Sequence, residues 1–127
     1  MSAPPPNADS IICADLRSIR GVHFRFNEAK IGKAAAAQLD YVAAALDKCD
    51  DHMLRIDGYT DSLGSSELNT SLAGQRAEAV KVYLVDHGIR EKRLVAKGFA
   101  DASPAASNQT SAGRAQNRRV ELALVLE

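Results

Sequence analysis

The feature that most constrains the fold is a strand, a turn and a helix that follow one another over residues 58–80. Ser65 or Ser66 can cap the first turn of a helix, and Gly88 permits the left-handed residue that commonly ends one. Between these ends, small and apolar residues recur at the three- and four-residue spacing of a buried helical face. That stripe consists of Ala73, Ala77, Val80 and Leu84. The stretch therefore predicts a long helix that packs on a sheet.

Two opposite charges accompany this helix. Asp61 lies on the turn before it, where the helix dipole favours a carboxylate. Arg76 lies roughly 70° from the centre of the buried stripe, at 100° per residue. Its stem is therefore expected at the edge of the core, with the guanidinium free. We predict that Asp61 and Arg76 form a small clamp for a charged ligand; the alternative is an internal salt bridge that ties the turn to the helix.

The rest of the chain supplies further strands and a second long helix. Alternating apolar residues predict four strands, at residues 22–26, 53–59, 93–99 and 119–126. A second helix is predicted for residues 29–48, from apolar residues at helical spacing. Residues 100–113 are small and polar and contain a proline, which favours a surface loop. The predicted order is β-α-β-α-β-β, in an α+β fold.

This order implies a four-stranded sheet, mixed parallel and antiparallel, with both long helices on one face. The strand–helix–strand connections favour parallel pairing. Residues 1–8 are Pro-rich and are expected to form a flexible linker. Residues 9–127 then form one domain that begins with a short helix over residues 9–19.

Composition excludes several classes of protein. A chain of 127 residues with 46% hydrophobic residues suits one compact domain. Its 16 basic and 16 acidic side chains leave no net charge, so we expect no nucleic-acid partner and no purely electrostatic binding to an anionic bilayer. Its apolar stretches fall well short of the ~20 residues that span a membrane, so none is expected to do so.

The sequence carries no pattern typical of an enzyme. It has neither the G-x-S-x-G elbow of serine hydrolases nor a glycine-rich phosphate loop. Asp57 and Asp61 straddle Gly58, but Asp57 alternates to the opposite sheet face and is expected to be solvated. Three histidines are scattered without metal-ligand spacing. We predict a non-catalytic protein without a cofactor or a metal.

Two cysteines, Cys13 and Cys49, lie 36 positions apart. Neither belongs to a C-x-x-C pair, which argues against a zinc site or a thioredoxin-like motif. A disulfide, two buried thiols and one reactive thiol all remain compatible with the residues themselves.

The strand–turn–helix stretch resembles the signature of the OmpA-like C-terminal domain. The matching positions are Thr60-Asp61, Gly64, Asn69, Leu72 and Arg76-Ala77. VHFRFN at residues 22–27 and GRAQNRRVEL at residues 113–122 continue the resemblance in the family's order. It covers roughly residues 22–126. The family binds peptidoglycan without covalent attachment in the bacterial envelope, and its fold agrees with the order reached from the pattern.

The resemblance implies a ligand and its contacts. A diaminopimelate residue of the stem peptide carries an ammonium and a carboxylate on one side-chain carbon. Asp61 would accept from the ammonium, and Arg76 would hold the carboxylate with two parallel hydrogen bonds. Asn27, Asn69 and Arg118 match further pocket positions. Asn69 could equally make a local turn bond, and Arg118 could equally pair with a carboxylate at the edge of the core.

The resemblance also implies a location and a role. An oxidising envelope compartment favours a disulfide between Cys13 and Cys49. The expected location is the periplasm, in association with the outer membrane, where the domain would tether a membrane-linked region upstream of this chain to the cell wall. The alternative is a protein-interaction domain of the same fold, which serves assembly of an envelope machine without binding the wall. Tyr59 and Ala73 depart from the His and Ser common in the family.

Overall fold

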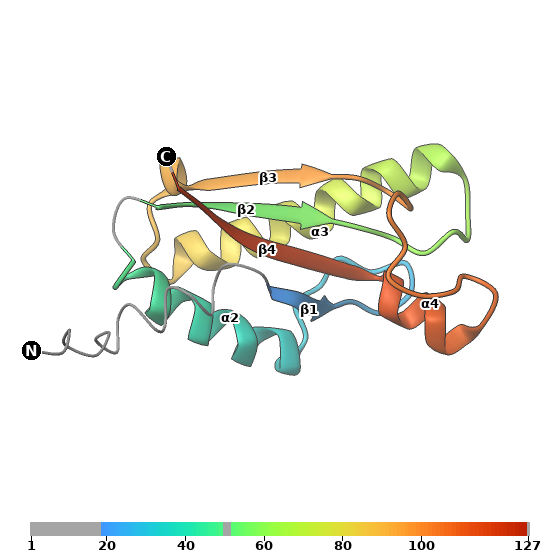
Figure 1. The fold of residues 1–127 in the computed structure, drawn as a ribbon, viewed down its shortest axis with the longest axis horizontal. Helices are drawn as coiled ribbons and strands as arrows, with labels where there is room; N and C mark the ends of the chain where they lie inside the picture. Colours follow the sequence, from blue (N-terminus) through green and yellow to red (C-terminus); the bar gives the residue numbers. More distant parts are fainter. Residues whose placement is uncertain (1–18, 50–51, 127) are drawn as a thin grey trace, which may run out of the picture.

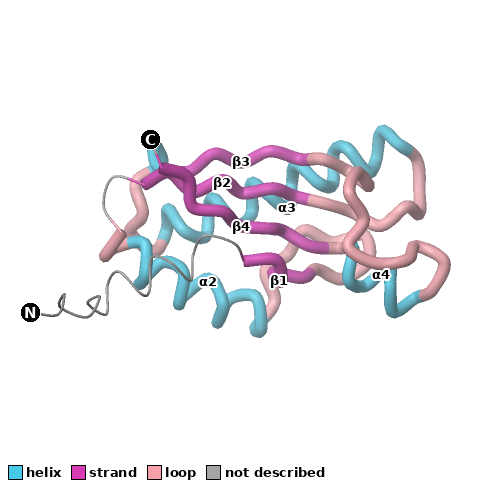
Figure 2. Tube along the Cα trace, viewed as in Figure 1, coloured by secondary structure: helices cyan, strands magenta, loops and turns pink. Residues whose placement is uncertain are grey.

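The computed structural model describes residues 19–49 and 52–126 and contains a four-stranded sheet (Figures 1 and 2). Its strand order is β1-β4-β2-β3. The strands are β1 (Ile19–His23), β2 (His52–Gly58), β3 (Leu94–Gly98) and β4 (Arg119–Leu126). β2 and β3 are parallel, and β4 is antiparallel to both β1 and β2. The predicted mixed sheet and α+β class are confirmed.

The helices of the described chain are α2 (Lys33–Leu46), α3 (Ser66–Asp86) and α4 (Ser111–Asn117), with a 3-10 turn, η1 (Glu91–Arg93). Both predicted ends of α3 are confirmed. The Ser65 hydroxyl accepts from the Leu68 N–H at 3.1 Å, and Gly88 has a φ of 97°. No described helix is long and apolar enough to cross a membrane.

The hydrophobic core lies between the sheet and the two long helices. The predicted stripe of α3, from Ala73 to Leu84, has no solvent exposure. It packs with buried residues of α2, such as Leu39 and Val42, and of the strands, such as Leu54 and Ile56. Burial of these side chains drives the two layers together, at ~25 cal/mol for each Å² of apolar surface removed from water.

α3 lies unusually close to the ends of β2 and β3. A Cβ built on Gly58 would lie 2.1 Å from the Ala73 carbonyl oxygen, and one on Gly98 would lie 2.5 Å from the Gly74 nitrogen. No side chain fits at either position. Because these two glycines have no side chain, the ends of β2 and β3 can lie directly against α3. The turn that carries Asp61 is therefore next to the helix that carries Arg76.

Two predicted boundaries are wrong at the start of the domain. β1 ends at His23, so residues 24–26, which were predicted to belong to the strand, lie outside it. The chain turns here, because Asn27 adopts a φ of 59°, and Phe26 is 58% exposed. α2 begins only after Gly32, four residues later than residue 29 where the helix was predicted to start.

The predicted loop at residues 100–113 was also too long, because α4 begins at Ser111. Its N-cap is Thr110, whose hydroxyl accepts from the Gly113 N–H at 2.9 Å. The linker at residues 1–8 and the short helix at 9–19 lie outside the described residues, apart from Ile19, which opens β1. Cys49 is 1% exposed; Cys13 lies outside the described residues, so the disulfide stays a prediction.

Candidate functional site

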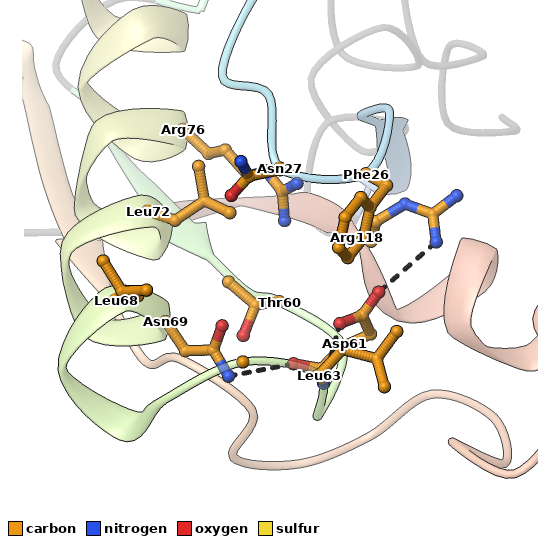
Figure 3. Close-up of a pocket in the computed structure, with 11 residues that line it drawn as sticks. Phe26, Asn27, Thr60, Asp61, Leu63, Leu68, Asn69, Leu72, Arg76 and Arg118 are labelled. Carbon is orange, nitrogen blue, oxygen red and sulfur yellow. Dashed lines mark hydrogen bonds and ion pairs between the residues drawn. The ribbon is translucent and has the colours of Figure 1, made fainter.

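A small pocket opens where the loop after β1, the turn after β2, the first half of α3 and the start of β4 meet (Figure 3). Its volume is about 50 Å³, space for roughly three to five water-sized groups. Eleven residues line it: Phe26, Asn27, Thr60, Asp61, Leu63, Gly64, Leu68, Asn69, Leu72, Arg76 and Arg118. All five residues that the sequence suggested for a site are thus brought together.

Asp61 is 3% exposed and lies at one side of the pocket. One carboxylate oxygen accepts from the Leu63 N–H at 3.0 Å. The other pairs with the Arg118 guanidinium at 3.3 Å (Figure 3). The alternative to a ligand clamp was an internal salt bridge between Asp61 and Arg76, and that alternative is wrong because Asp61 pairs with Arg118 instead. Of the alternatives for Arg118, the pairing with a carboxylate is confirmed.

Arg76 is fully buried, and the expectation that its guanidinium stays free is also wrong. Its nitrogens donate to three backbone carbonyls, of Glu28 at 2.8 Å, Arg25 at 2.9 Å and Tyr59 at 3.0 Å. The loop over residues 25–28 folds across the edge of α3 and covers the side chain. A guanidinium has five N–H groups, so these three bonds leave two further donors on a side chain that lines the pocket.

The charges of the pocket act on one another. The pKa of Arg76 is lowered to about 10, mainly by burial and also by the positive charge of Arg118, while the Asp61 carboxylate opposes both effects. Arg76 is still protonated at neutral pH. Two guanidinium groups and one carboxylate line the pocket, so its formal charge is plus one.

The loop after β1 is held by both arginines. Arg118 donates from Nε to the Phe24 carbonyl at 3.0 Å, while Arg76 binds the carbonyls of Arg25 and Glu28. Asn27 lies between these anchors, in the left-handed conformation and exposed to solvent. The loop therefore presents the Asn27 side chain at the pocket.

Asn69 lies on α3 and connects this helix to the turn that carries Asp61. Its side-chain amide donates to the Asp61 carbonyl at 3.4 Å, which is the local turn bond that the sequence left open. Asn69 also lines the pocket, so both alternatives remain compatible with its position.

Sequence analysis missed several pocket residues, of which Thr60 is the most informative. Thr60 is 3% exposed, and its hydroxyl oxygen has no hydrogen-bond partner among the described residues. A buried hydroxyl without a partner costs free energy, which suits an atom that awaits a ligand. Its position directly before Asp61 in the quoted motif was the available signal.

A second network lies on the sheet face away from the helices. Asp57 was expected to be solvated, but it is 6% exposed and pairs with Arg55 at 2.9 Å. β2 is a central strand, and Asp57 lies opposite Lys97 on β3 and Glu121 on β4. Arg119 packs over the Tyr59 ring at 4.0 Å and pairs with Glu121. Among the described residues, no group of three acidic, His or Cys side chains could hold a metal ion.

The geometry and the motifs agree with a comparison against protein families. The model of the OmpA family matches residues 23–118, which include all eleven residues of the pocket. The chain therefore belongs to the OmpA family. Members are non-enzymatic binding domains, in agreement with the expectation of a non-catalytic protein.

Relatives and solved structures are similar over most of the chain. The peptidoglycan-binding protein ArfA of Mycobacterium tuberculosis is 40% identical over 94% of this chain and 39% of its own length. The probable lipoprotein YiaD of Escherichia coli is 38% identical over 93% of this chain and 52% of its own length. The chain thus spans between about two fifths and half of these relatives.

The fold is matched by the crystal structure of the peptidoglycan-associated lipoprotein from Burkholderia pseudomallei. The TM-score is 0.77 at 31% sequence identity, over 85% of this chain and 89% of that one. The similarity extends over nearly the whole of a solved envelope domain.

Proposed function

We propose that this domain binds peptidoglycan non-covalently, and that its pocket takes the charged side-chain end of a diaminopimelate residue from the stem peptide. The observation that carries the proposal is one small hollow bounded by a carboxylate and two guanidinium groups. A ligand group with an ammonium and a carboxylate on one carbon can pair with both signs at once.

Each polar group of the pocket has a role in this proposal. Asp61 accepts from the ammonium, since a carboxylate has more acceptor positions than its two present bonds use. Arg76 donates its two remaining N–H groups to the ligand carboxylate. The Thr60 hydroxyl gains the partner it lacks. Asn27 and Asn69 hydrogen-bond the peptide at the rim, and Arg118 keeps Asp61 in position.

The size and charge of the pocket favour a peptide end over a sugar. A volume of about 50 Å³ suits a small charged head group. The formal charge of plus one favours a ligand that brings a carboxylate.

The relatives support this assignment and a location in the cell envelope. One is named as peptidoglycan-binding, one as a probable lipoprotein and one as a peptidoglycan-associated lipoprotein. We infer that the domain lies in the periplasm and tethers an outer-membrane-associated protein to the wall. Single-site affinity is expected to be modest, because a few charged contacts must offset desolvation and ordering, and a polymeric wall adds avidity.

The proposal is tested by sedimentation with purified sacculi. Wild type should appear in the pellet, whereas Asp61→Asn and Thr60→Val should shift to the supernatant. Thr60→Val is the sharper variant, because it preserves shape and removes a hydroxyl that contributes no internal bond, so the fold should keep its full stability. Thr70→Val, on the exposed side of α3, is the control; it removes a hydroxyl that donates to the Ser66 carbonyl within the helix and lies outside the pocket, so it should sediment like wild type.

The diaminopimelate assignment has its own experiment. Isothermal titration with a stem tripeptide that ends in meso-diaminopimelate should give binding, and the lysine analogue, which lacks the second carboxylate, should bind about tenfold or more weakly. Equal affinity for the two tripeptides would reject diaminopimelate but leave wall binding intact. Failure of wild type to sediment with sacculi would favour the alternative, an assembly domain of the same fold without wall binding.

A further inference from the structure

The helical side of the molecule carries two hollows, one between α3 and the segment before α2, and one between α2 and the residues that follow α3. The first has a volume of about 460 Å³ and an apolar floor formed by Ile31, Ala79, Val82 and Tyr83. The second has a volume of about 520 Å³ and is lined by residues that include Asp40, Asp47 and His87. We refer to both together as the helix-face groove. It shares no lining residue with the ligand pocket.

Tyr83 joins the two hollows. Its hydroxyl donates to the Asp40 carboxylate at 2.5 Å, and its ring stacks on His87 with 4.1 Å between centroids. His87 in turn lies 3.6 Å from Asp40. Tyr83 lines the first hollow and its partners Asp40 and His87 line the second, so these contacts connect the two hollows across α3 and α2.

The groove is both apolar and acidic. Val82 is 48% exposed on its floor. Carboxylates of Glu78 and Asp86 line the first hollow, and those of Asp40 and Asp47 line the second. Neither lysine nor arginine lines either hollow. Because the whole chain has no net charge, this clustering of negative groups is a local property of the surface.

We propose that the helix-face groove binds a basic amphipathic segment of a protein partner. Apolar side chains of the segment pack on Val82 and Ile31, and lysine or arginine side chains on either flank meet the four carboxylates. The groove follows α3 from Gln75 to His87, roughly 18 Å at 1.5 Å per residue, which matches a helix of about twelve residues. The same carboxylates repel nucleic acid, anionic lipid and the acidic groups of the wall.

Because the groove and the pocket are separate, one domain can hold the wall and the partner at once. The proposal therefore does not depend on the proposed function. It assigns the domain a second role, as the point where a basic protein segment meets a wall-bound anchor.

The test is an NMR titration of the full 127-residue chain with a defined probe. The probe is an 18-residue peptide of leucine and lysine with one apolar helical face. Amide shifts should concentrate at residues 75–87 and 40–47, and the affinity should fall as salt rises. A peptide of the same composition in scrambled order, and one with glutamate for lysine, should bind at least fivefold more weakly.

Matched variants locate the contact. Val82→Ser should weaken probe binding about fivefold, whereas Val95→Ser, at an equally exposed valine on β3, should leave it unchanged. The pair Glu78→Gln and Asp86→Asn should weaken binding, and the pair Glu67→Gln and Asp101→Asn should not. Shifts spread over the whole surface, or equal losses in target and control variants, would overturn the proposal.

A second copy of this chain is the other candidate occupant of the groove, so self-association has to be distinguished from binding of a partner. If sedimentation velocity detected a dimer that Val82→Ser dissociates, the groove would belong to a second copy and the proposal would be wrong. Sedimentation of Val82→Ser with sacculi should equal wild type in either case, so failure here is separable from failure of wall binding.

Discussion

Arg76 is the residue on which the local structure of the pocket depends most. Its three bonds reach carbonyls that lie 17, 48 and 51 positions away along the chain. One side chain therefore fixes the end of β2 and the loop after β1 in a single arrangement. The Phe24 ring, 5.4 Å from the guanidinium carbon, adds a cation–π contact.

Replacement of this side chain by another cation should be costly. Arg76→Lys keeps the charge but lacks the planar fork, so buried carbonyls lose their donors. We expect a loss of roughly 2–4 kcal/mol in the free energy of unfolding, measured by urea denaturation. Arg90→Lys, at an exposed arginine, should cost almost nothing. Similar losses for both variants would contradict the structural role of Arg76.

The pH dependence of this variant provides an independent check. In the folded protein the pKa of Arg76 is lowered to about 10. At pH 6 to 9 this arginine is protonated in both the folded and the unfolded chain. Its ionisation therefore does not change the free energy of unfolding over that range. A lysine at the same place starts from about 10.4, and burial lowers its pKa further. The stability gap between Arg76→Lys and wild type should therefore narrow as pH rises from 8 to 10. A constant gap would show that the lysine side chain escapes to solvent.

At the scale of elements, the contact between α3 and the parallel strands depends on backbone proximity. A Cβ on Gly98 would lie 2.5 Å from the Gly74 nitrogen, whereas a Cβ on Gly74 would have nothing within 4 Å. The same substitution at these two neighbouring glycines should have opposite effects.

We expect Gly98→Ala to lower the free energy of unfolding by about 2 kcal/mol or more, because α3 must move away from β3. Gly74→Ala should raise it by roughly 0.5–1 kcal/mol, since alanine restricts the unfolded chain and favours the helix. Chemical denaturation of both variants measures the difference. A stabilising effect of Gly98→Ala would mean that the helix does not lie where the structure has it.

Elements whose signals are local could be predicted from the sequence. The capping serine, the terminal glycine and the apolar stripe of α3 all lie within the helix or beside it, and each was confirmed. The buried state of Arg76 could not be predicted in the same way. A helical wheel relates a residue to its own helix, but the loop that covers Arg76 comes from a distant part of the chain.

The loop before α4 demonstrates the same limit. Its small polar sequence suggested irregular structure, yet it is ordered by Asn117, which is fully buried. The Asn117 side-chain oxygen accepts from the N–H groups of Ala105 and Ala106 at 2.8 and 2.9 Å. Its amide donates to Asn108, whose side chain in turn accepts from the Ser62 N–H at 3.3 Å. Two asparagines, Asn117 and Asn108, thus connect α4, this loop and the Asp61 turn, and no periodicity in the sequence signals such contacts.

At the scale of the whole molecule, the predicted disulfide would connect the segment before β1 to the end of α2. Mass spectrometry of the unreduced, denatured protein after alkylation should detect no modified cysteine. Reduction should lower the free energy of unfolding by about 3–4 kcal/mol, from the entropy of the 36-residue loop. Alkylation of both Cys13 and Cys49 without reduction would disprove the pairing.

For a domain that tethers a protein to the wall, as proposed, the position of β1 determines how a pulling force reaches the pocket. β1 is an edge strand that pairs only with β4 among the described strands, and the loop directly after it forms one wall of the ligand hollow. A pull on the chain from before Ile19 would first unzip β1 and then strain the arginine bonds that hold this loop. In the proposed tether, detachment of this five-residue strand and release of a peptide from the pocket would therefore be coupled.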